Sequence, residues 1–465
     1  MVTVARPRNI FLPLWRRIKQ SRTPMLHATL DLTGSGGIAR LFRMPPRFSL
    51  FPQPAMLDIN GEYMVPLDAF QDTLVRNFLE ILNRVCKPGK ELAPDEVDNI
   101  VNEVVRVTRK LYPEVPAKVC HREFQKIMRV VFAFALNQAL PTDLHFGMDM
   151  KEWARRARAP RRVDLMVYPI EVDGRRSCPE DCLICYAKSP AMSFVGSELL
   201  TTEEWLKVIK KLGRISIPEL TFTGGEATVR LDLVQLISAA REFCTRLNTS
   251  GVLMTPKLAA QLKEAELDSV QITLYSNKPY IHNLCVGRDG AFDRTVRGIR
   301  NAVAAALNVS VNIPLLRHNS RTFTDTIRYV VDNGVRVITC SGLIETGGAR
   351  DELNRGNGLT PKELLDVLRK GIAVARSLGI SLQFTSPGKL QMAALKQLGL
   401  DVPECGASLS NMAVMPNGRV VHCQSWLKSK RGLGHILKTP WWMIWNHPAC
   451  VAVRREKALR NACPL

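Results

Sequence analysis

Short apolar runs alternate with segments of helical periodicity between residues 163 and 388. The strand-like runs are VDLMVYP, ELTFT, the segment around Leu247–Thr249, VQITLY, VSVNIPLL, VRVITC and ISLQFT. The helical segments between them begin near Thr201, Leu231, Leu258, Phe292, Phe323 and Thr360. Such alternation predicts a parallel sheet, because each crossover helix packs against one face of the sheet. The pattern alone fits both a closed or partial barrel and a doubly wound open sheet.

A helical region precedes this alternating pattern. Apolar residues recur at helical spacing from Leu67 to Val85, from Val97 to Leu111 and from Phe124 to Leu136. Three amphipathic helices are therefore expected in a small domain over residues 65–160, which an arginine-rich stretch ends near Pro160. Residues 1–64 are basic and contain several prolines and glycines, so we expect loose structure there.

Composition and charge restrict the class of protein. The chain has 465 residues, 46% of them hydrophobic, which excludes disorder over most of its length. No apolar run is long enough for a membrane span. The formal charge of +21 is concentrated in residues 1–50 and 406–465. These basic ends suit an anionic partner such as a nucleic acid, a membrane surface or an acidic peptide, and equally suit a solvated surface.

The 12 cysteines point to metal or redox chemistry. We expect a cytoplasmic protein, in which thiols stay reduced and do not form a disulfide framework. Cys178, Cys182 and Cys185 lie in SCPEDCLICY with the spacing C-x3-C-x2-C. Three thiolates can hold a four-iron cluster and leave one iron open to another ligand. A zinc site needs a fourth protein ligand, and the nearest histidine in the sequence, His145, is far upstream.

A second motif ends the second predicted strand. Gly224, Gly225 and Glu226 lie in TFTGGEATVR. Paired glycines let a ligand approach the backbone, and a carboxylate can bind an ammonium group. By itself Gly-Gly-Glu is more often a turn, but on the strand that follows the cysteine segment it favours a binding role.

These two motifs and the later run VQITLYSNKPYIHNLCVGRDGAFDRTVRGI resemble the radical S-adenosylmethionine (radical SAM) superfamily over about residues 163–388. The resemblance implies a partial (β/α)6-type parallel barrel over residues 161–390. It implies that Cys178, Cys182 and Cys185 bind a [4Fe–4S] cluster whose open iron is chelated by SAM. Reductive cleavage of SAM then yields a 5′-deoxyadenosyl radical that abstracts hydrogen from a substrate.

The same resemblance implies which residues contact SAM. They are Gly224, Gly225, Glu226, Thr249 and Thr273. One departure is Ile184, because many members place an aromatic residue before the third cysteine.

The segment 391–465 carries a further cysteine pattern. Cys405, Gly418 and Cys423 have the spacing C-x12-G-x4-C, which resembles the auxiliary-cluster extension called SPASM or its shorter relative called twitch. The chain lacks the further C-x2-C-x5-C-x3-C run, so one auxiliary [4Fe–4S] cluster is expected, with Cys450 and Cys463 as the remaining candidate ligands. The Asn417-Gly418 turn predicts a hairpin that returns Cys423 towards Cys405. The alternative is a zinc site on Cys405, His422, Cys423 and Cys463.

Three other residues near the predicted barrel mouth have less defined roles. Cys340 ends the sixth predicted strand and is a candidate hydrogen-atom donor to a substrate radical, although a packed thiol is the better-supported reading. Cys285 has no assigned role. His282 has no identifiable partner, and a surface or loop-ordering role is favoured.

Three functions remain open from the sequence. The run TLYSNKPYIHNLCVG resembles radical SAM enzymes that modify ribosomally made peptides, and auxiliary clusters are frequent among them. The alternatives are a radical SAM enzyme of cofactor or tetrapyrrole biosynthesis and a nonenzymatic zinc-bound nucleic-acid-binding protein. Either enzyme needs an electron donor such as a ferredoxin or flavodoxin.

Overall fold

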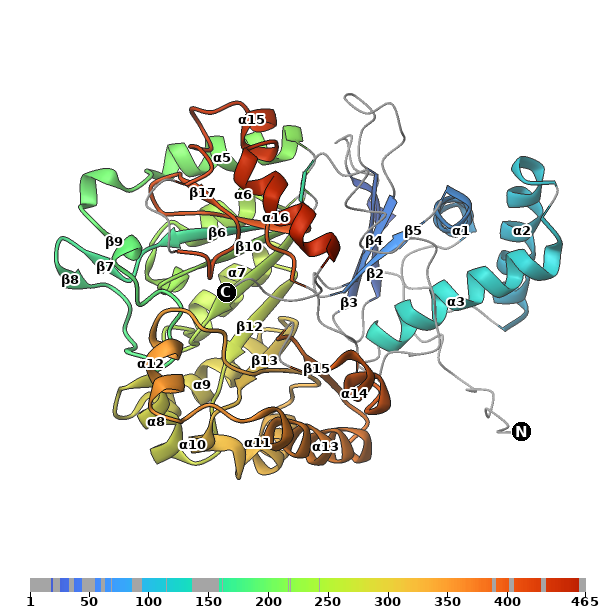
Figure 1. Ribbon diagram of the computed structural model, residues 1–465. Coiled ribbons are helices and arrows are strands. Elements are labelled where there is room, and N and C mark those ends of the chain that lie inside the picture. The colour runs from blue at the N-terminus through green and yellow to red at the C-terminus, as the bar shows by residue number, and fades with distance from the viewer. Residues whose placement is uncertain are drawn as a thin grey trace. The chain divides into compact units, whose positions relative to one another are not determined.

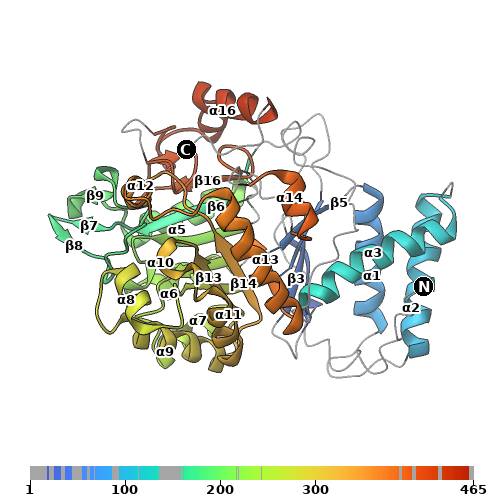
Figure 2. The ribbon, with the colours of Figure 1, turned by 60° about the horizontal axis from the view of Figure 1, so that its bottom comes forward.

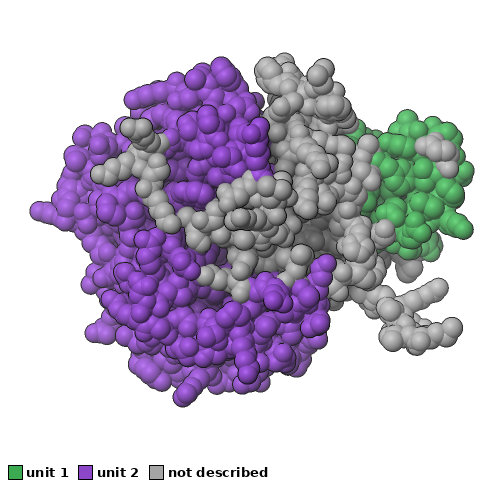
Figure 3. All heavy atoms as spheres, in the orientation of Figure 1, with its two compact units in different colours: residues 1–46, 51–136, 143–149 green, residues 47–50, 137–142, 150–465 purple. Residues whose placement is uncertain are grey.

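The computed structural model of the chain divides into two compact units (Figure 3). Unit 1 comprises residues 1–46, 51–136 and 143–149, and unit 2 comprises residues 47–50, 137–142 and 150–465. Within them the structure describes residues 18–19, 26–32, 37–43, 55–59, 63–67, 69–85, 94–113, 115–135, 159–160, 162–215, 217, 219–241, 243–386, 390–400, 405–427 and 432–459. In this described part no helix is both long and apolar enough to cross a membrane.

Unit 1 begins with an antiparallel sheet in which each strand pairs with the next. The strands are β1 (Ile18–Lys19), β2 (Leu26–Leu32), β3 (Gly37–Arg43), β4 (Ala55–Ile59) and β5 (Tyr63–Leu67). The expectation of loose structure in residues 1–64 is therefore wrong. Apart from Gly37, which begins β3, the prolines and glycines that suggested it lie between the strands in the sequence, where such residues are common.

Three helices follow the sheet, as the apolar periodicity predicts. They are α1 (Ala69–Val85), α2 (Pro94–Leu111) and α3 (Ala117–Ala135). Their facing sides bury Leu74, Val104 and Phe124, and the rings of Phe78 and Phe124 meet edge to face at 5.0 Å. The strands of residues 1–64 and these helices belong to the same compact unit.

Unit 2 is built on a sheet of nine strands in the order β15-β14-β13-β12-β11-β10-β6-β16-β17. Seven of them are the predicted strands, and all six pairings among these seven are parallel. Their bounds are β6 (Arg162–Tyr168), β10 (Glu219–Gly224), β11 (Cys244–Thr249), β12 (Ser269–Thr273), β13 (Val309–Pro314), β14 (Val337–Ser341) and β15 (Ser381–Phe384). The described strands leave β15 at one edge and do not close on β6, so the predicted partial barrel is confirmed.

Crossover helices follow the strands, and Figures 1 and 2 show α9, α11 and α13 along the outer side of the sheet. Thr201 and Glu204 form the capping box that begins α5, with the Glu204 carboxylate accepting from Thr201 N at 2.9 Å. The buried face of α5 places Trp205 in the core. The helices are α5 (Thr202–Ile215), α6 (Leu233–Ala239), α7 (Pro256–Glu264), α8 (Pro279–Val286), α9 (Ala291–Ala304), α10 (Arg317–Ser320), α11 (Phe323–Asp332), α12 (Gly348–Asn354) and α13 (Pro361–Ser377).

The C-terminal segment joins the barrel sheet. After α14 (Met392–Gln397), strand β16 (Asn411–Val414) pairs in parallel with β6 and turns back into β17 (Val420–Val421). The turn contains Gly418 at φ 80°, which confirms the predicted hairpin. Helices α15 (Trp441–Trp445) and α16 (Pro448–Leu459) complete the segment. The pairing of β16 with β6 is not predicted by the sequence pattern.

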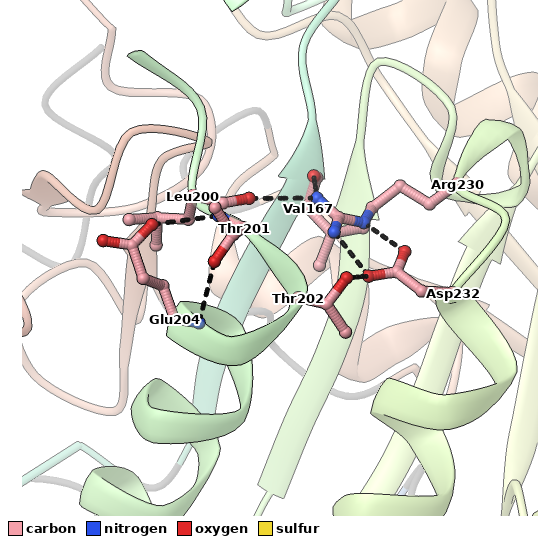
Figure 4. A network of polar contacts seen from close by, with 7 residues as sticks. All are labelled: Val167, Leu200, Thr201, Thr202, Glu204, Arg230 and Asp232. Atoms are coloured by element: carbon pink, nitrogen blue, oxygen red, sulfur yellow. Dashed lines mark hydrogen bonds and ion pairs between the residues drawn. The ribbon is translucent and has the colours of Figure 1, made fainter. Parts of the chain in front are cut away.

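One polar network ties three of these elements together near the strand ends (Figure 4). The Arg230 guanidinium donates to both Asp232 carboxylate oxygens, at 2.7 and 2.6 Å, and to the carbonyl of Val167 on β6 at 3.2 Å. Thr202 Oγ1 donates to the same carboxylate at 2.6 Å. Because Arg230 and Asp232 are largely buried, this network fixes the starts of α5 and α6 against β6.

We therefore expect Arg230→Lys to lower the free energy of unfolding by about 1–2 kcal/mol, because lysine cannot keep the two-pronged contact. Arg214→Lys on the exposed side of α5 is the matched control and should change it by less than about 0.5 kcal/mol. Denaturant midpoints of the two variants measure the difference. Equal midpoints would show that the network contributes little.

Candidate active site

The cysteine segment is a loop between β6 and α5 that is held by its backbone. Residues 177–189 form only turns and bends, flanked by the short strands β7 (Glu171–Val172), β8 (Arg175–Arg176) and β9 (Ser193–Phe194). Asp181 N donates to Val286 O at 2.8 Å, and Leu183 N donates to Cys285 O at 2.8 Å, at the end of α8. Gly348 N donates to Cys185 O at 3.0 Å. The loop is thus anchored by the regions after β12 and β14.

Cys178, Cys182 and Cys185 line one cavity of about 280 Å³. None of the three is in a disulfide. Burial, followed by the neighbouring Glu226, raises the pKa of the Cys178 thiol to about 12. Burial likewise raises the pKa of Cys182 and of Cys185. Buried thiols of this kind ionise when positively charged metal binds them, so the donor set fits an iron–sulfur cluster.

The arrangement of the described side chains does not suggest a single-ion site. No group of three or more His, Cys, Asp or Glu residues among them is placed to hold one metal ion. A four-iron cluster takes one thiolate on each ligated iron, so its thiols lie further apart than those around one ion.

The Gly-Gly-Glu turn lines the same cavity and is packed against the end of β6, and Cys178 Sγ donates to Gly225 O at 3.7 Å. Gly225 N donates to Tyr168 O at 2.7 Å, and a Cβ on Gly225 would lie 2.4 Å from Pro169 O. Tyr186 Oη, from the cysteine loop, donates to Gly224 O at 2.9 Å. The glycines are thus required by the close approach of another chain segment, a reason that the sequence alone does not reveal.

The Glu226 carboxylate is buried and saturated by its own neighbours. Oε1 accepts from Thr228 N at 3.1 Å, Thr228 Oγ1 at 2.7 Å and Thr249 Oγ1 at 2.7 Å. Oε2 accepts from Ser250 N at 2.8 Å and Ser250 Oγ at 2.7 Å. Glu226 therefore fixes the end of β11, where the predicted SAM contact Thr249 lies, together with Ser250 of the following turn.

The rest of the cavity wall comes from the barrel strands. Thr273 lines it, as do the amide side chains of Asn248, Gln271 and Asn312. Gln271 Nε2 donates to Thr339 Oγ1 at 3.2 Å, and Thr339 Oγ1 donates to Asn312 Oδ1 at 3.0 Å. This wall is polar and uncharged.

Two cavity residues were not predicted to have a role in binding. Glu180 is 2% exposed, and burial raises its pKa to about 7 in spite of the nearby charge of Arg294. His282 is 1% exposed, and burial lowers its pKa to about 4, so the ring is neutral at pH 7. No sequence signal marks either residue, because their burial is a property of the tertiary structure.

Cys340 is not brought to the cavity. Its neighbour Thr339 contacts the cavity residues Gln271 and Asn312, and successive residues of a strand point to opposite faces. The Cys340 thiol is fully buried and donates to Gln383 O at 3.5 Å. The prediction of a hydrogen-atom donor at Cys340 is therefore not supported, and the residue is a packed thiol. Cys285 is fully buried beside the cysteine loop.

The second cysteine group lies on the β16–β17 hairpin and α16. Ser408 N donates to His422 O at 3.0 Å, which brings the segments after Cys405 and before Cys423 together. Ser408 Oγ also donates to Cys450 Sγ at 3.4 Å. Cys450 is fully buried, and burial raises the pKa of its thiol. Cys463 lies outside the described residues.

The same segment reaches the cavity. Gln424, the residue after Cys423, lines it, and Ser425 O accepts from Thr346 Oγ1 at 2.9 Å. The two cysteine groups therefore belong to one connected region of unit 2.

Known families match both regions. Residues 175–330 match the radical SAM superfamily, a range that includes the cysteine loop and the Gly-Gly-Glu turn. Residues 405–464 match the iron–sulfur cluster-binding domain SPASM. This chain carries a radical SAM domain and a C-terminal SPASM domain. It is an enzyme that uses a [4Fe–4S] cluster and SAM, with auxiliary iron–sulfur binding in the SPASM domain. These two domain matches favour an enzyme over the alternative of a nonenzymatic zinc-bound nucleic-acid-binding protein.

Solved structures share the fold of this radical SAM enzyme at low sequence identity. SuiB from Streptococcus suis is 12% identical, with 87% of each chain covered and a TM-score of 0.54. SuiB bound to its precursor peptide SuiA is 12% identical, with 86% of this chain and 87% of SuiB covered and a TM-score of 0.55. SuiB bound to S-adenosylmethionine is 13% identical, with the same coverage and a TM-score of 0.53.

Replacing Cys178, Cys182 and Cys185 together by Ala should remove about four irons per chain and abolish SAM cleavage. Cys285→Ala, which removes a buried thiol beside the loop, should keep both the iron and the activity. Iron analysis and 5′-deoxyadenosine formation under reducing conditions measure the two effects. If the triple variant still formed 5′-deoxyadenosine, these thiols would not be the ligands.

The SPASM cysteines are expected to bind a separate cluster. Cys405→Ala with Cys423→Ala should lower the iron content while SAM cleavage persists and substrate turnover fails. Truncation after residue 448, which removes Cys450 and Cys463, should have the same effect if these two residues are also ligands. Full iron content with normal turnover in the truncated protein would exclude them.

Proposed function

We propose that this radical SAM enzyme modifies a ribosomally made peptide. The observation that carries the proposal is the extent of the likeness to SuiB, which binds a precursor peptide. The likeness covers 86% of this chain, more than unit 2 contains, and therefore extends into unit 1. An enzyme whose substrate contacts only the barrel would not need a region equivalent to unit 1.

The cavity wall also suits a peptide. Its uncharged amide and hydroxyl groups, on Asn248, Gln271, Thr273 and Asn312, can donate to and accept from backbone amides. A substrate with several carboxylates, such as a tetrapyrrole, would call for cationic side chains on this wall. None of the described residues that line this cavity is a lysine or an arginine.

We assign the cluster to Cys178, Cys182 and Cys185, and SAM contacts to Gly224, Gly225, Glu226, Thr249 and Thr273. When bound, the cluster and SAM supply a 5′-deoxyadenosyl radical that abstracts a hydrogen atom from the substrate. The electron for this step is assigned to a one-electron donor such as a ferredoxin or flavodoxin.

The protein's own groups have positioning roles in this proposal. Tyr186 joins the cysteine loop to the Gly-Gly-Glu turn, and Glu226 holds the end of β11 at Thr249. Gln424 places one SPASM residue at the cavity, close to where a peptide would lie. The SPASM cysteines, Cys405 and Cys423 with Cys450 and Cys463, are assigned to the auxiliary site.

The test is anaerobic incubation of reconstituted enzyme, SAM and a reductant with synthetic peptides that correspond to any short open reading frames next to its gene. We expect a change in peptide mass that accompanies 5′-deoxyadenosine formation, because hydrogen abstraction leaves a modified residue. The triple cysteine variant is the control and should leave the mass unchanged. Formation of 5′-deoxyadenosine with no change in the mass of any peptide tested would contradict the peptide proposal.

A further inference from the structure

Four side chains that line the cavity have a buried polar atom with no partner among the described residues: Glu180, His282, Asn248 and Gln424. Only Glu180 among them is a carboxylate, and only His282 has an unpaired nitrogen. Both carboxylate oxygens of Glu180 are buried, and no described group donates a hydrogen bond to them. The Nε2 atom of His282 is likewise buried and unpaired. Both side chains line the same cavity as the three thiols. Buried polar groups in folded proteins are nearly always hydrogen-bonded, so an unpaired acceptor and an unpaired donor in one cavity point to a ligand.

The hydrogen on His282 can be located from its other nitrogen. Nδ1 accepts from Tyr275 N at 3.2 Å, so in the neutral ring it carries no hydrogen. The hydrogen is therefore on Nε2, which is a hydrogen-bond donor. The imidazole is held from both sides by the rings of Tyr275 and Phe292, each with its centroid 6.0 Å away.

Glu180 differs from the other acidic residue of the cavity, Glu226. The Glu226 carboxylate already accepts five hydrogen bonds from Thr228, Thr249 and Ser250. Glu180 accepts none on its side chain, and the charge of Arg294 acts on it only from a distance. The carboxylate with free acceptor capacity is thus the one on the cysteine loop.

A backbone hydrogen bond links the loop that carries Glu180 to the helix that carries His282. Asp181, which follows Glu180, donates its backbone N–H to Val286 O at 2.8 Å. Val286 ends the helix α8 that carries His282. A ligand that bridges the two side chains therefore meets a preformed pair of groups, and little conformational entropy is lost on binding.

We propose that Glu180 and His282 together bind the amino-acid end of SAM. Glu180 accepts a hydrogen bond from the amino group, and His282 Nε2–H donates one to the carboxylate. An amino acid carries one donor group and one acceptor group on the same carbon, which matches this pair. When the amino group and the carboxylate of SAM bind iron, the amino group still has N–H bonds and the carboxylate still has lone pairs for these contacts. The inference rests on the cavity being the SAM site of the proposed function.

The test measures SAM dissociation constants of the reconstituted holoenzyme by anaerobic calorimetry without reductant, so that no turnover occurs. The variants are Glu180→Gln and His282→Asn, whose Oδ1 can still accept from Tyr275 N. The ligands are SAM, decarboxylated SAM and an analogue in which hydrogen replaces the amino group. Each variant should weaken SAM binding by roughly 10- to 150-fold, the range for a hydrogen bond to a charged group.

The analogues identify which contact each residue makes. His282→Asn should leave the affinity for decarboxylated SAM unchanged, and Glu180→Gln should leave the affinity for the amino-free analogue unchanged. Glu226→Gln is the comparison variant. It loosens the contacts to Thr249 and Ser250 and should lower the affinity for all three ligands by the same factor. Iron analysis checks that each variant retains its cluster. If Glu180→Gln lost its cluster, His282→Asn, which lies outside the cysteine loop, would still decide the proposal.

Two results would overturn the assignment. One is an unchanged SAM dissociation constant in both variants with full iron content. The other is an equal loss of affinity for SAM and for both analogues, which indicates an indirect effect through the loop. Failure of the unaltered holoenzyme to bind SAM at all would instead overturn the proposed function, and this inference with it.

Discussion

The chemistry of this enzyme depends on where a loop without regular structure is held. Three backbone hydrogen bonds fix it, from Asp181 and Leu183 to the end of α8 and from Gly348 to Cys185. A Cβ on Gly348 would lie 2.2 Å from Leu183 O, so the turn after β14 touches the loop backbone directly. Because such bonds use only main-chain atoms, the loop sequence is free to supply thiols and a carboxylate to the cavity.

The barrel could be predicted because its signal is local. Each of the seven strands and its following helix shows its own periodicity, and Thr360 and Glu363 repeat the capping box found at Thr201. Strands β1–β5 could not be predicted, because the prolines and glycines of their connections obscured the strand pattern. Strand β16 has four residues, too few for a periodic signal, and its neighbour β6 is distant in the sequence.

The site could be predicted in part. The motif order brought the cysteine loop and the Gly-Gly-Glu turn to one cavity, because the ends of adjacent parallel strands lie together. Cys340 ends its predicted strand and was expected at the barrel mouth. Because side chains alternate along β14, the neighbouring residue Thr339 faces the cavity and Cys340 does not. Glu180 and His282 could not be identified, because whether a polar atom has a partner depends on side chains from other strands.

The position of β16 bears on the order in which the chain is made. Strand β6 is the first barrel strand to leave the ribosome, and β10 soon pairs with one of its edges. The other edge of β6 stays unpaired until residues 411–414 have been synthesised. Asp164 on β6 likewise gains a hydrogen bond only then, from the side-chain amide of Asn411 to its carboxylate at 3.0 Å. Until then the nascent barrel exposes an open strand edge, the feature that promotes pairing between chains. Chains halted before residue 411 therefore keep this edge of β6 open to pairing with another chain.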